Sequence, residues 1–320
     1  MPLPFALREA VERELSRLER PHVARAAEQI TTDYKAGRFG GSLSSAEARA
    51  AYLITRLPAT YAACAWAFAE VAHRLPEFAP TNVLDLGAGP GTASWAAAER
   101  WPSLREFTLV EANREFANLG QQLSEQSDVL KNASWTIADV QALPDLPIAD
   151  VVVLSYAFGE FRDPLAVLHK AWAATKEVLV IIEPGTPRNF EPVLRARREL
   201  ISAGAHMLSP CPHELECPML LNADWCHFAV RLERTSEHRR MKGGALGYED
   251  EKFSYLAFVK HAAYPAETRI VRHPRTHSGY IQLTLCTAEG LQQQTITRSQ
   301  KEAFRAARRA KWGDEWRQLE

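Results

Sequence analysis

The stretch Asn82–Thr92, NVLDLGAGPGT, constrains the fold more than any other part of this sequence. A short run of strand-forming residues ends in a turn that holds three glycines, Gly87, Gly89 and Gly91, and a helix-forming segment follows. Glycines in such a turn let the backbone approach a ligand without Cβ clashes, and the helix that follows offers free amides and a positive dipole end. This pattern predicts a nucleotide-type site where a first strand turns into a helix.

The residues that follow alternate between strand and helix patterns. Strands are expected at 82–86, 107–111, 135–138, 150–154 and 178–183, and helices at 92–100, 113–126 and 163–174. Strands that alternate with helices form a parallel sheet covered on both faces, and right-handed crossovers make that sheet doubly wound. The expected fold class is therefore α/β, with ligand sites at the carboxyl ends of the strands.

Other segments flank this core. The amino-terminal part is helical in pattern, with one helix expected at 5–35, a Gly/Ser-rich break at 35–45 and a capping-box sequence at Ser44–Glu47. After Pro184 the alternation lapses, and strand patterns return at 251–260, 279–287 and 292–297 before a helix at 299–312. We therefore expect a helical domain at 1–78, a core at 79–185 and 251–298, a cysteine-bearing insertion at 186–250 and a basic helix at 299–320.

Acidic residues stand where a nucleoside cofactor would need them. Asp85 precedes the first glycine by two positions, Glu111 ends the second strand, where it can accept bonds from both ribose hydroxyls, and Asp139 follows the third strand, placed to meet an adenine amino group. The third glycine comes one residue earlier than in the dinucleotide fingerprint. The combination resembles class I S-adenosylmethionine-dependent methyltransferases, which are Rossmann-like, more than nicotinamide enzymes. The predicted cofactor-binding residues are Asp85, Gly87, Gly89, Gly91, Glu111 and Asp139. Glu111 and Asp139 as plain surface acids, and a nicotinamide site, are the alternatives.

The segment after the fourth strand would face the methyl acceptor, and it reads SYAFGE, Ser155–Glu160. Methyltransferases of exocyclic amines carry an acid or Asn followed by Pro-Pro and an aromatic residue there, and this motif is absent. Tyr156 and Phe158 are candidates for stacking on a base or for core packing, and Glu160 is a candidate general base. Cys211 is the candidate thiolate for a 5-methylpyrimidine mechanism. The catalytic residues are left open.

Three of the five cysteines, Cys211, Cys217 and Cys226, fall within sixteen residues, and Cys286 ends a later predicted strand. Four thiolates suit either a tetrahedral zinc ion or an iron–sulfur cluster. Their spacing does not match the usual zinc-ribbon pairs, whereas the Cys-Pro pairs are similar to ferredoxin-like runs. A set of unlinked buried thiols is the plain alternative. The nearby substitute ligands are His213 and His227.

Composition narrows the class of protein. The hydrophobic fraction of 46% and the charged fraction of 24% are ordinary for a globular chain. No apolar run approaches the roughly 20 residues of a membrane helix, and the start is charged from Arg8 onward, unlike a secretory signal. The odd cysteine count, with Cys64 expected in the core of a small-residue helix, indicates reduced thiols rather than a disulfide framework. We expect a cytoplasmic protein of bacterial type without a targeting segment.

The overall net charge of −1 hides an asymmetry. Residues 81–185 carry 7 Lys/Arg against 14 Asp/Glu, a net of −7, while residues 260–311 carry 10 against 3, a net of +7. A basic segment of this kind can attract a polyanion such as RNA, because neutralised phosphates release counterions. A solvated helix face with loops is the alternative explanation.

Several stretches jointly resemble one family, the methyltransferase-like proteins of the small ribosomal subunit in mitochondria and bacteria. The matching stretches are AYLITRLPATYAA (51–63), DLGAGPGT (85–92), SPCPHELECPM (209–219), DWCHF (224–228), YEDEKFSYL (248–256), RHP (272–274), GYIQLTLC (279–286) and WGDEW (312–316). The resemblance covers about residues 40–320. It implies a Rossmann-like methyltransferase domain that associates with small-subunit rRNA during ribosome assembly. It also implies a 4Fe-4S cluster on Cys211, Cys217, Cys226 and Cys286.

Within that resemblance the basic region becomes the predicted RNA surface. The candidate RNA-binding residues are Arg272, Arg275, Arg305, Arg308 and Arg309, of which the last three share a helix face by their spacing. Three functions follow as hypotheses. The chain is an rRNA methyltransferase that uses S-adenosylmethionine, a non-catalytic assembly factor that binds rRNA, or a nicotinamide oxidoreductase with an iron–sulfur relay. No membrane partner is expected.

Overall fold

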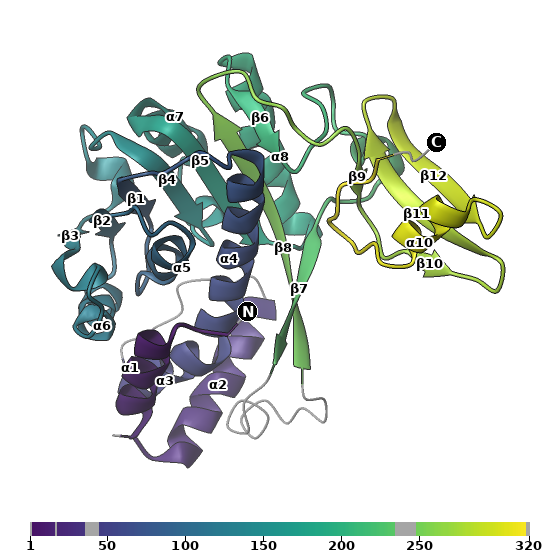
Figure 1. Cartoon of the computed structure of the whole chain (residues 1–320). Helices are drawn as coiled ribbons and strands as arrows, with labels where there is room; N and C mark the ends of the chain where they lie inside the picture. The colour runs from purple at the N-terminus through teal and green to yellow at the C-terminus, as the bar shows by residue number, and fades with distance from the viewer. Residues whose placement is uncertain (1, 17, 36–44, 234–247, 318–320) are drawn as a thin grey trace.

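The computed structural model describes residues 2–16, 18–35, 45–233 and 248–317. Its centre is an eight-stranded sheet with the order β3-β2-β1-β4-β5-β8-β6, and β7 pairs with β8 (Figure 1). The first half of the core runs β1 (Asn82–Leu86), α5 (Thr92–Arg100), β2 (Glu106–Glu111), α6 (Arg114–Ser124), β3 (Ser134–Ile137), β4 (Ala149–Ser155), α7 (Pro164–Ala174) and β5 (Thr175–Pro184). These bounds lie within a few residues of those predicted from the sequence.

The sheet has the strand order and directions of a class I methyltransferase. Strands β1 to β5 pair in parallel, and the last strand to join, β8 (Tyr248–Val259), runs antiparallel between β5 and β6 (His206–Ser209). The central strands are buried on both faces, which explains why they are nearly continuous apolar runs. The predicted α/β, doubly wound Rossmann-like fold is confirmed.

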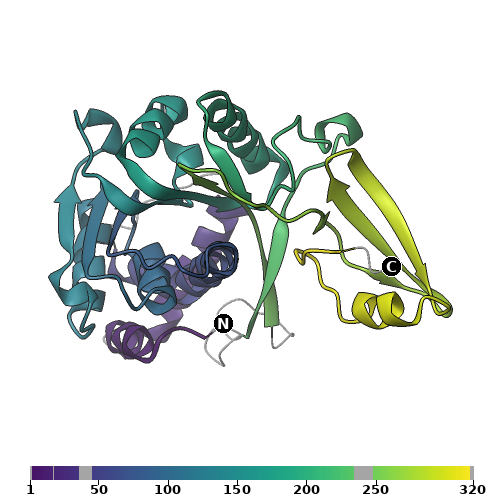
Figure 2. The same cartoon turned by 45° about the horizontal axis from the view of Figure 1, so that its top comes forward.

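Alternate residues of each strand enter two different cores. Val151, Val153 and Val180 pack with α4 and α5 on one side, while Val152 and Leu179 pack with α7 and α8 on the other. The sheet is therefore the middle of three layers, visible edge-on in Figure 2. Because the strands are parallel and in register, the carboxyl ends of β1, β2, β3 and β4 meet at one edge.

Four helices form the amino-terminal part: α1 (Phe5–Ser16), α2 (Arg20–Lys35), α3 (Ala46–Thr55) and α4 (Leu57–Arg74). The single helix expected at 5–35 is two helices, because Pro21 suits a first helical turn but not a helix interior. Ser45 caps α3, accepting a bond from the Ala48 amide at 3.0 Å, as the capping-box sequence predicted; Ser44 lies outside the described residues.

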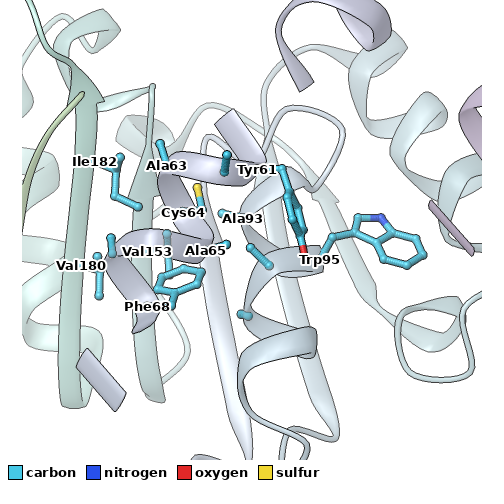
Figure 3. Close-up of a cluster of buried hydrophobic side chains, with 14 of the residues drawn as sticks. Tyr61, Ala63, Cys64, Ala65, Phe68, Ala93, Trp95, Val153, Val180 and Ile182 are labelled. Carbon is cyan, nitrogen blue, oxygen red and sulfur yellow. The ribbon is translucent and has the colours of Figure 1, made fainter. Parts of the chain in front are cut away.

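Helix α4 joins this part to the sheet. Cys64 is fully buried on α4 among Phe68, Val153 and Ile182, as Figure 3 shows. Its Sγ lies 3.1 Å from Ser155 Oγ at the end of β4. The expectation that Cys64 is a core residue is confirmed.

The chain after Pro184 contains more regular structure than the sequence pattern indicated. Helix α8 (Pro187–Ser202) starts at the N-cap Thr186 and packs on β5 and β8, and β7 (Phe228–Glu233) pairs with β8. Three prolines at 184, 187 and 192 conceal the helix in the sequence, although Pro187 stands at a first-turn position that favours it.

A second, smaller sheet stands apart from the first (Figure 1). It contains β9 (Arg269–Ile270), β10 (Arg275–Thr276), β11 (Tyr280–Thr287) and β12 (Gly290–Thr297), and helix α10 (Lys301–Ala307) packs on it. The expected core segment 251–298 thus divides between two sheets. From Tyr280 to Leu285, β11 alternates between exposed or half-buried residues and buried ones. This part of the strand needs one covered face, whereas a central strand of a parallel sheet is covered on both.

No helix among the described residues is long and apolar enough to cross a membrane.

Candidate cofactor cavity and cysteine site

The glycine loop has the backbone that its sequence requires. Gly87, Gly89 and Gly91 have φ angles of 69°, 54° and 77°, in the left-handed region that glycine adopts readily. A Cβ on Gly87 would lie 2.5 Å from the Cβ of Ala157, which follows β4. The loop therefore approaches the neighbouring strand end as closely as the backbone allows.

The loop borders a cavity of about 530 Å³ at the carboxyl ends of the strands. This volume lies in the range of small-molecule sites. The predicted residues that line the cavity are Gly87, Gly89, Glu111, Asp139, Tyr156 and Glu160. Helices α2, α3 and α4 cover the opposite side through Ala26, Gln29, Ile30, Ala48, Tyr52 and Thr60.

Glu111 links the loop to the cavity. It is buried, its Oε2 accepts a bond from the Gly89 amide at 2.7 Å, and its Oε1 accepts one from the Asn113 amide at 2.7 Å. Burial raises the pKa of Glu111 while these amides oppose the shift. Each carboxylate oxygen has two lone pairs, so both oxygens keep acceptor capacity after binding one amide. Glu111 thus holds the loop and can still accept bonds from ligand hydroxyls.

Two predicted cofactor residues do not line the cavity. Asp85 is buried under the loop, and its Oδ2 accepts bonds from the Ser94 amide at 3.2 Å and the Ser94 hydroxyl at 2.8 Å. Loss of hydration raises the pKa of Asp85 to about 6. Gly91 is the N-cap of α5. Both residues shape the loop from behind, whereas Asp139 is exposed at the cavity, where its Oδ1 caps a short turn through the Gln141 amide.

The side chains of Tyr156, Phe158 and Glu160, in the segment after β4, lie in three different surroundings. Phe158 is buried in the core against α7 and α8, so the core-packing alternative holds for it. Tyr156 lines the cavity with a φ of 55°, and its hydroxyl donates to Glu251 Oε1 at 2.9 Å, an oxygen that Arg56 also reaches at 3.3 Å. Burial and the Glu251 carboxylate raise the pKa of Tyr156 well above its usual value. Glu160 stands at the exposed rim, where partial burial and Glu111 raise its pKa to about 7.

The four predicted cysteine ligands gather at a second site. Cys211, Cys217, Cys226 and Cys286 all line one small cavity of about 30 Å³. Cys211 therefore lies apart from the glycine-loop cavity. All five cysteines of the chain are free thiols. Burial raises the pKa of Cys217 to about 11 and that of Cys286 to about 12, so these thiols ionise only beside added positive charge.

A buried arginine accompanies the cysteines. Arg197 of α8 is 3% exposed, its Nε donates to Cys211 Sγ at 3.4 Å, and its Nη2 donates to the His213 carbonyl at 2.7 Å. His213 also lines the cavity, with its Nε2 3.9 Å from Cys286 Sγ. His227 does not line it and stacks on Trp225 instead.

The donor chemistry fits an inorganic group with several attachment points. Among the described residues, no three His, Cys, Asp or Glu side chains are grouped closely enough to hold a single metal ion. The four cysteines nevertheless line one small cavity, together with apolar residues such as Val193, Leu194 and Met219. Cysteine sulfurs are the ligands of zinc and iron–sulfur sites, so the residue types that line this cavity fit such a group.

The predicted RNA-binding arginines are divided in space. Arg272 donates to Asp224 and to the Trp225 carbonyl beside the cysteine segment. Arg275 is exposed on β10. Arg305 is exposed on α10, and Arg308 and Arg309 follow directly after that helix. Arg269, another basic residue of this region, is buried and paired with Glu70 at 2.7 Å.

Sequence reasoning missed the cover over the cofactor cavity and the pocket arginine. Tyr52 and Thr60 lie in the stretch 51–63, which was noted for its resemblance to a family but not for lining a site. Arg197 sits inside a segment read as irregular. The available signal was spacing, because Arg197 lies three or four residues from Val193, Leu194 and Leu200, on the apolar side of a helical pattern.

Comparisons with known proteins found one matching family and several relatives. The sequence profile of the family "Mitochondrial small ribosomal subunit Rsm22" matches residues 46–317. The chain is 29% identical over 291 residues to human "Ribosome assembly protein METTL17, mitochondrial", which covers 82% of this chain and 61% of that protein. It is 24% identical over 293 residues to "Rsm22-cox11 tandem protein 2, mitochondrial" of Schizosaccharomyces pombe, covering 73% of this chain and 38% of that protein. The chain thus spans less than two thirds of either relative.

Among solved structures, the plantazolicin methyltransferase BpumL in complex with SAH aligns at 12% identity and a TM-score of 0.40, over 80% of this chain and 99% of that one.

Proposed function

The chain belongs to the Rsm22 family of mitochondrial small ribosomal subunit proteins, and from that premise we propose that it binds S-adenosylmethionine and acts on small-subunit rRNA during ribosome assembly. One observation carries the cofactor half of this proposal. The glycine loop, Glu111 and Asp139 line a single cavity at the carboxyl edge of a class I methyltransferase sheet. The partner half rests on the family and on the names of the relatives.

The residues of the cavity fit the parts of the cofactor. Glu111 would accept bonds from the ribose hydroxyls, Asp139 would meet the adenine amino group, and Gly87 and Gly89 would admit the amino-acid portion close to the backbone. When bound, the sulfonium supplies an electrophilic methyl group. The protein's part is then to orient an acceptor in line with that methyl and to exclude water. Glu160, at the rim with its raised pKa, is the residue placed to take a proton from an acceptor.

A specific observation favours a second candidate, the non-catalytic assembly factor. The side chain at the acceptor position, Tyr156, already donates its hydroxyl to Glu251, and Arg56 reaches the same carboxylate. The Tyr156 hydroxyl thus uses its only donor within the protein, and the segment Ser155–Glu160 lacks the acid or Asn with two prolines that exocyclic-amine methyltransferases carry there. In this alternative the cofactor stabilises the shape that rRNA recognises and transfers nothing.

Calorimetry tests cofactor binding. We expect S-adenosylmethionine and S-adenosylhomocysteine to bind, the nicotinamide cofactors to give no heat, and Gly89→Asp to abolish binding, because it places a side chain and a negative charge on a φ of 54° beside Glu111. Tritium transfer from labelled donor to small subunits of a deletion strain then separates the two candidates. Label above the Gly89→Asp background supports the enzyme, and its absence supports the assembly factor.

For the second site we propose a 4Fe-4S cluster on Cys211, Cys217, Cys226 and Cys286, with zinc as the alternative metal. Anaerobically purified protein should be brown and contain iron and sulfide. Cys226→Ser should lose both, while Cys64→Ala, which changes a buried thiol outside the cavity, should keep them. Colourless protein with stoichiometric zinc would contradict the cluster.

The cellular compartment of this chain should be that of its proposed ribosomal partner. Both relatives carry mitochondrial names, which do not support the cytoplasmic placement expected from the sequence. We propose that the chain resides where the small subunits that it serves are assembled.

A further inference from the structure

The small sheet has two unlike faces. Helix α10 covers one face through Ala303 and Ala307, which pack on Ile281, Leu283 and Ile296. Residues directly opposite on paired strands share a face, and successive residues alternate between faces. The register therefore puts a different set on the side away from α10. At one end Cys286 and Leu291 pack against the cysteine segment. The rest of this side, here called the open face, consists of Arg275, Tyr280, Gln282, Thr284, Gln293, Thr295 and Thr297.

The open face is polar and accessible. All seven of its residues are exposed or half-buried, and none of them is acidic or aliphatic. Thr284 and Gln293 hydrogen-bond each other across β11 and β12, which confirms that they share this side. A face of this composition lacks the apolar centre of a protein–protein interface. It offers amide and hydroxyl groups that can form hydrogen bonds with the polar edges of a ligand.

An aromatic pair stands at one end of this face. The rings of His277 and Tyr280 are stacked, with centroids 4.4 Å apart and planes 17° from parallel. The His277 amide donates to the Tyr280 carbonyl at 2.9 Å, which fixes the turn that carries both rings. Tyr280 is nevertheless 38% exposed. Two stacked rings held at the surface by a tight turn form a ready platform for a third flat ring.

Charge indicates the class of ligand. Residues 260–311 carry a net charge of +7, and Arg275 lies on the open face itself, opposite Gln282. A surface that joins a guanidinium, an aromatic platform and neutral hydrogen-bonding groups has the parts that bind single-stranded nucleic acid. A duplex keeps its bases stacked on one another and cannot use the platform.

We infer that the open face binds single-stranded RNA, with a base stacked on the Tyr280–His277 pair, the phosphate backbone at Arg275, and base edges meeting Gln282 and Thr295. This inference rests on the proposed rRNA-binding function and assigns it a surface. That surface lies on the side of the sheet opposite α10, so it is separate from Arg305, Arg308 and Arg309.

The test uses the full chain and a fluorescein-labelled oligouridine of about ten nucleotides, a length that spans a single binding site, followed by fluorescence anisotropy. Tyr280→Ala should weaken binding by about tenfold or more, because a stacked base loses its platform, while Tyr280→Phe should stay within about twofold of the unmodified chain. Exchanging Arg305, Arg308 and Arg309 for Ala serves as the matched control on the other face. It should reduce the salt dependence and keep the preference for single strands over a duplex of equal length.

The outcomes separate this inference from the function on which it rests. Equal binding of the oligouridine by Tyr280→Ala and the unmodified chain would overturn the open face as the site, and so would equal affinity for duplex and single strand. A chain that cosediments with small subunits but ignores the oligouridine overturns the inference and leaves the proposed function standing. If Tyr280→Ala weakens cosedimentation alone, the face contacts a ribosomal protein and the inference is also wrong. If the unmodified chain does not cosediment with small subunits, both the inference and the proposed function are wrong. Tyr280→Phe and thermal unfolding of each variant exclude misfolding as the cause.

Discussion

Glu183, at the end of β5, is a buried carboxyl group that the proposed cofactor chemistry does not use. Its Oε1 accepts a bond from the Phe158 amide at 2.9 Å, and its Oε2 lies 3.4 Å from Asn189 Nδ2. Burial raises the pKa of Glu183 from its ordinary 4.5 to about 7. The folded state thus favours the protonated group, and this contribution to stability is complete below about pH 4.5 and lost as the pH rises through about 7.

Glu183→Gln should therefore flatten the pH dependence of folding. Between pH 5.5 and 8, the unfolding free energy of the variant should rise by about 2 kcal/mol relative to that of the unmodified chain, because about 1.5 pH units of this range lie below the raised pKa, at 1.36 kcal/mol per unit. Urea unfolding at both pH values measures the difference. Glu191→Gln, an exposed change on α8, serves as the control. Parallel curves for Glu183→Gln and the unmodified chain would contradict the buried, protonated carboxyl.

Single residues of the cofactor site were predictable where their position alone determines their role. Glu111 ends a strand next to the glycine strand, so parallel register brings it to the loop, and Asp139 follows for the same reason. Asp85 shows the limit of such reasoning. Its place before the first glycine is shared by ligand-binding and structural acids, and the deciding partner, Ser94, becomes visible only when α5 folds back on β1.

At the scale of elements, Arg269 of β9 joins parts of the chain that are far apart in sequence. Its Nη1 donates to Glu70 Oε2 of α4 at 2.7 Å and to the Gly313 carbonyl at 2.7 Å, and its Nε donates to the Pro210 carbonyl at 3.1 Å. The side chain is 2% exposed. The small sheet, the cysteine segment and the helical layer are thus held by one buried cation.

Glu70→Ala should destabilise the fold by roughly 3 kcal/mol, because it leaves the Arg269 guanidinium buried without its counter-charge. Denaturant unfolding measures the loss, and Glu77→Ala, an exposed change just after α4, should leave the midpoint within experimental error. A Glu70→Ala chain as stable as the unmodified one would mean that the carbonyls of Pro210 and Gly313 and the hydroxyl of Ser209, which accepts from Arg269 Nη2 at 3.3 Å, suffice.

The helices and strands whose bounds were predicted best from the sequence are those that are most deeply buried. Strands β1 and β4 are apolar on both faces and short, so their bounds followed from residue type. Helix α8 was missed because prolines at its start conceal the amphipathic pattern. The division of β8 from β11 was also missed, since strand propensity gives no information on which sheet a strand joins. That depends on what covers each face, and α10 packs on β11 and β12.

At the scale of the whole molecule, part of the excess positive charge at residues 260–311 is neutralised by acidic partners inside the fold. Arg269 is buried and Arg272 is paired with Asp224, so two of the ten basic residues at 260–311 neutralise internal partners. Lys260 follows β8 of the large sheet and donates to the Trp172 carbonyl. The other seven lie on or beside the small sheet and α10, which Figure 1 shows at the end of the molecule away from β1, β2 and β3. A polyanion should therefore approach the small sheet first.

Reversing Arg305, Arg308 and Arg309 to Glu tests this polarity. These side chains are exposed at α10, and if each neutralises a phosphate, their loss should lower the slope of log affinity against log salt by roughly two to three. Binding of labelled small subunits across a salt series gives the slope.

The matched control reverses Arg100, Arg105 and Lys131, three exposed cations in the acidic half, for the same change in net charge. If both triple variants flatten the slope equally, net charge alone drives association and the small sheet has no privileged part in it. If only the α10 variant does so, the contact is local, because screening limits the reach of each charge to about 10 Å at ordinary ionic strength.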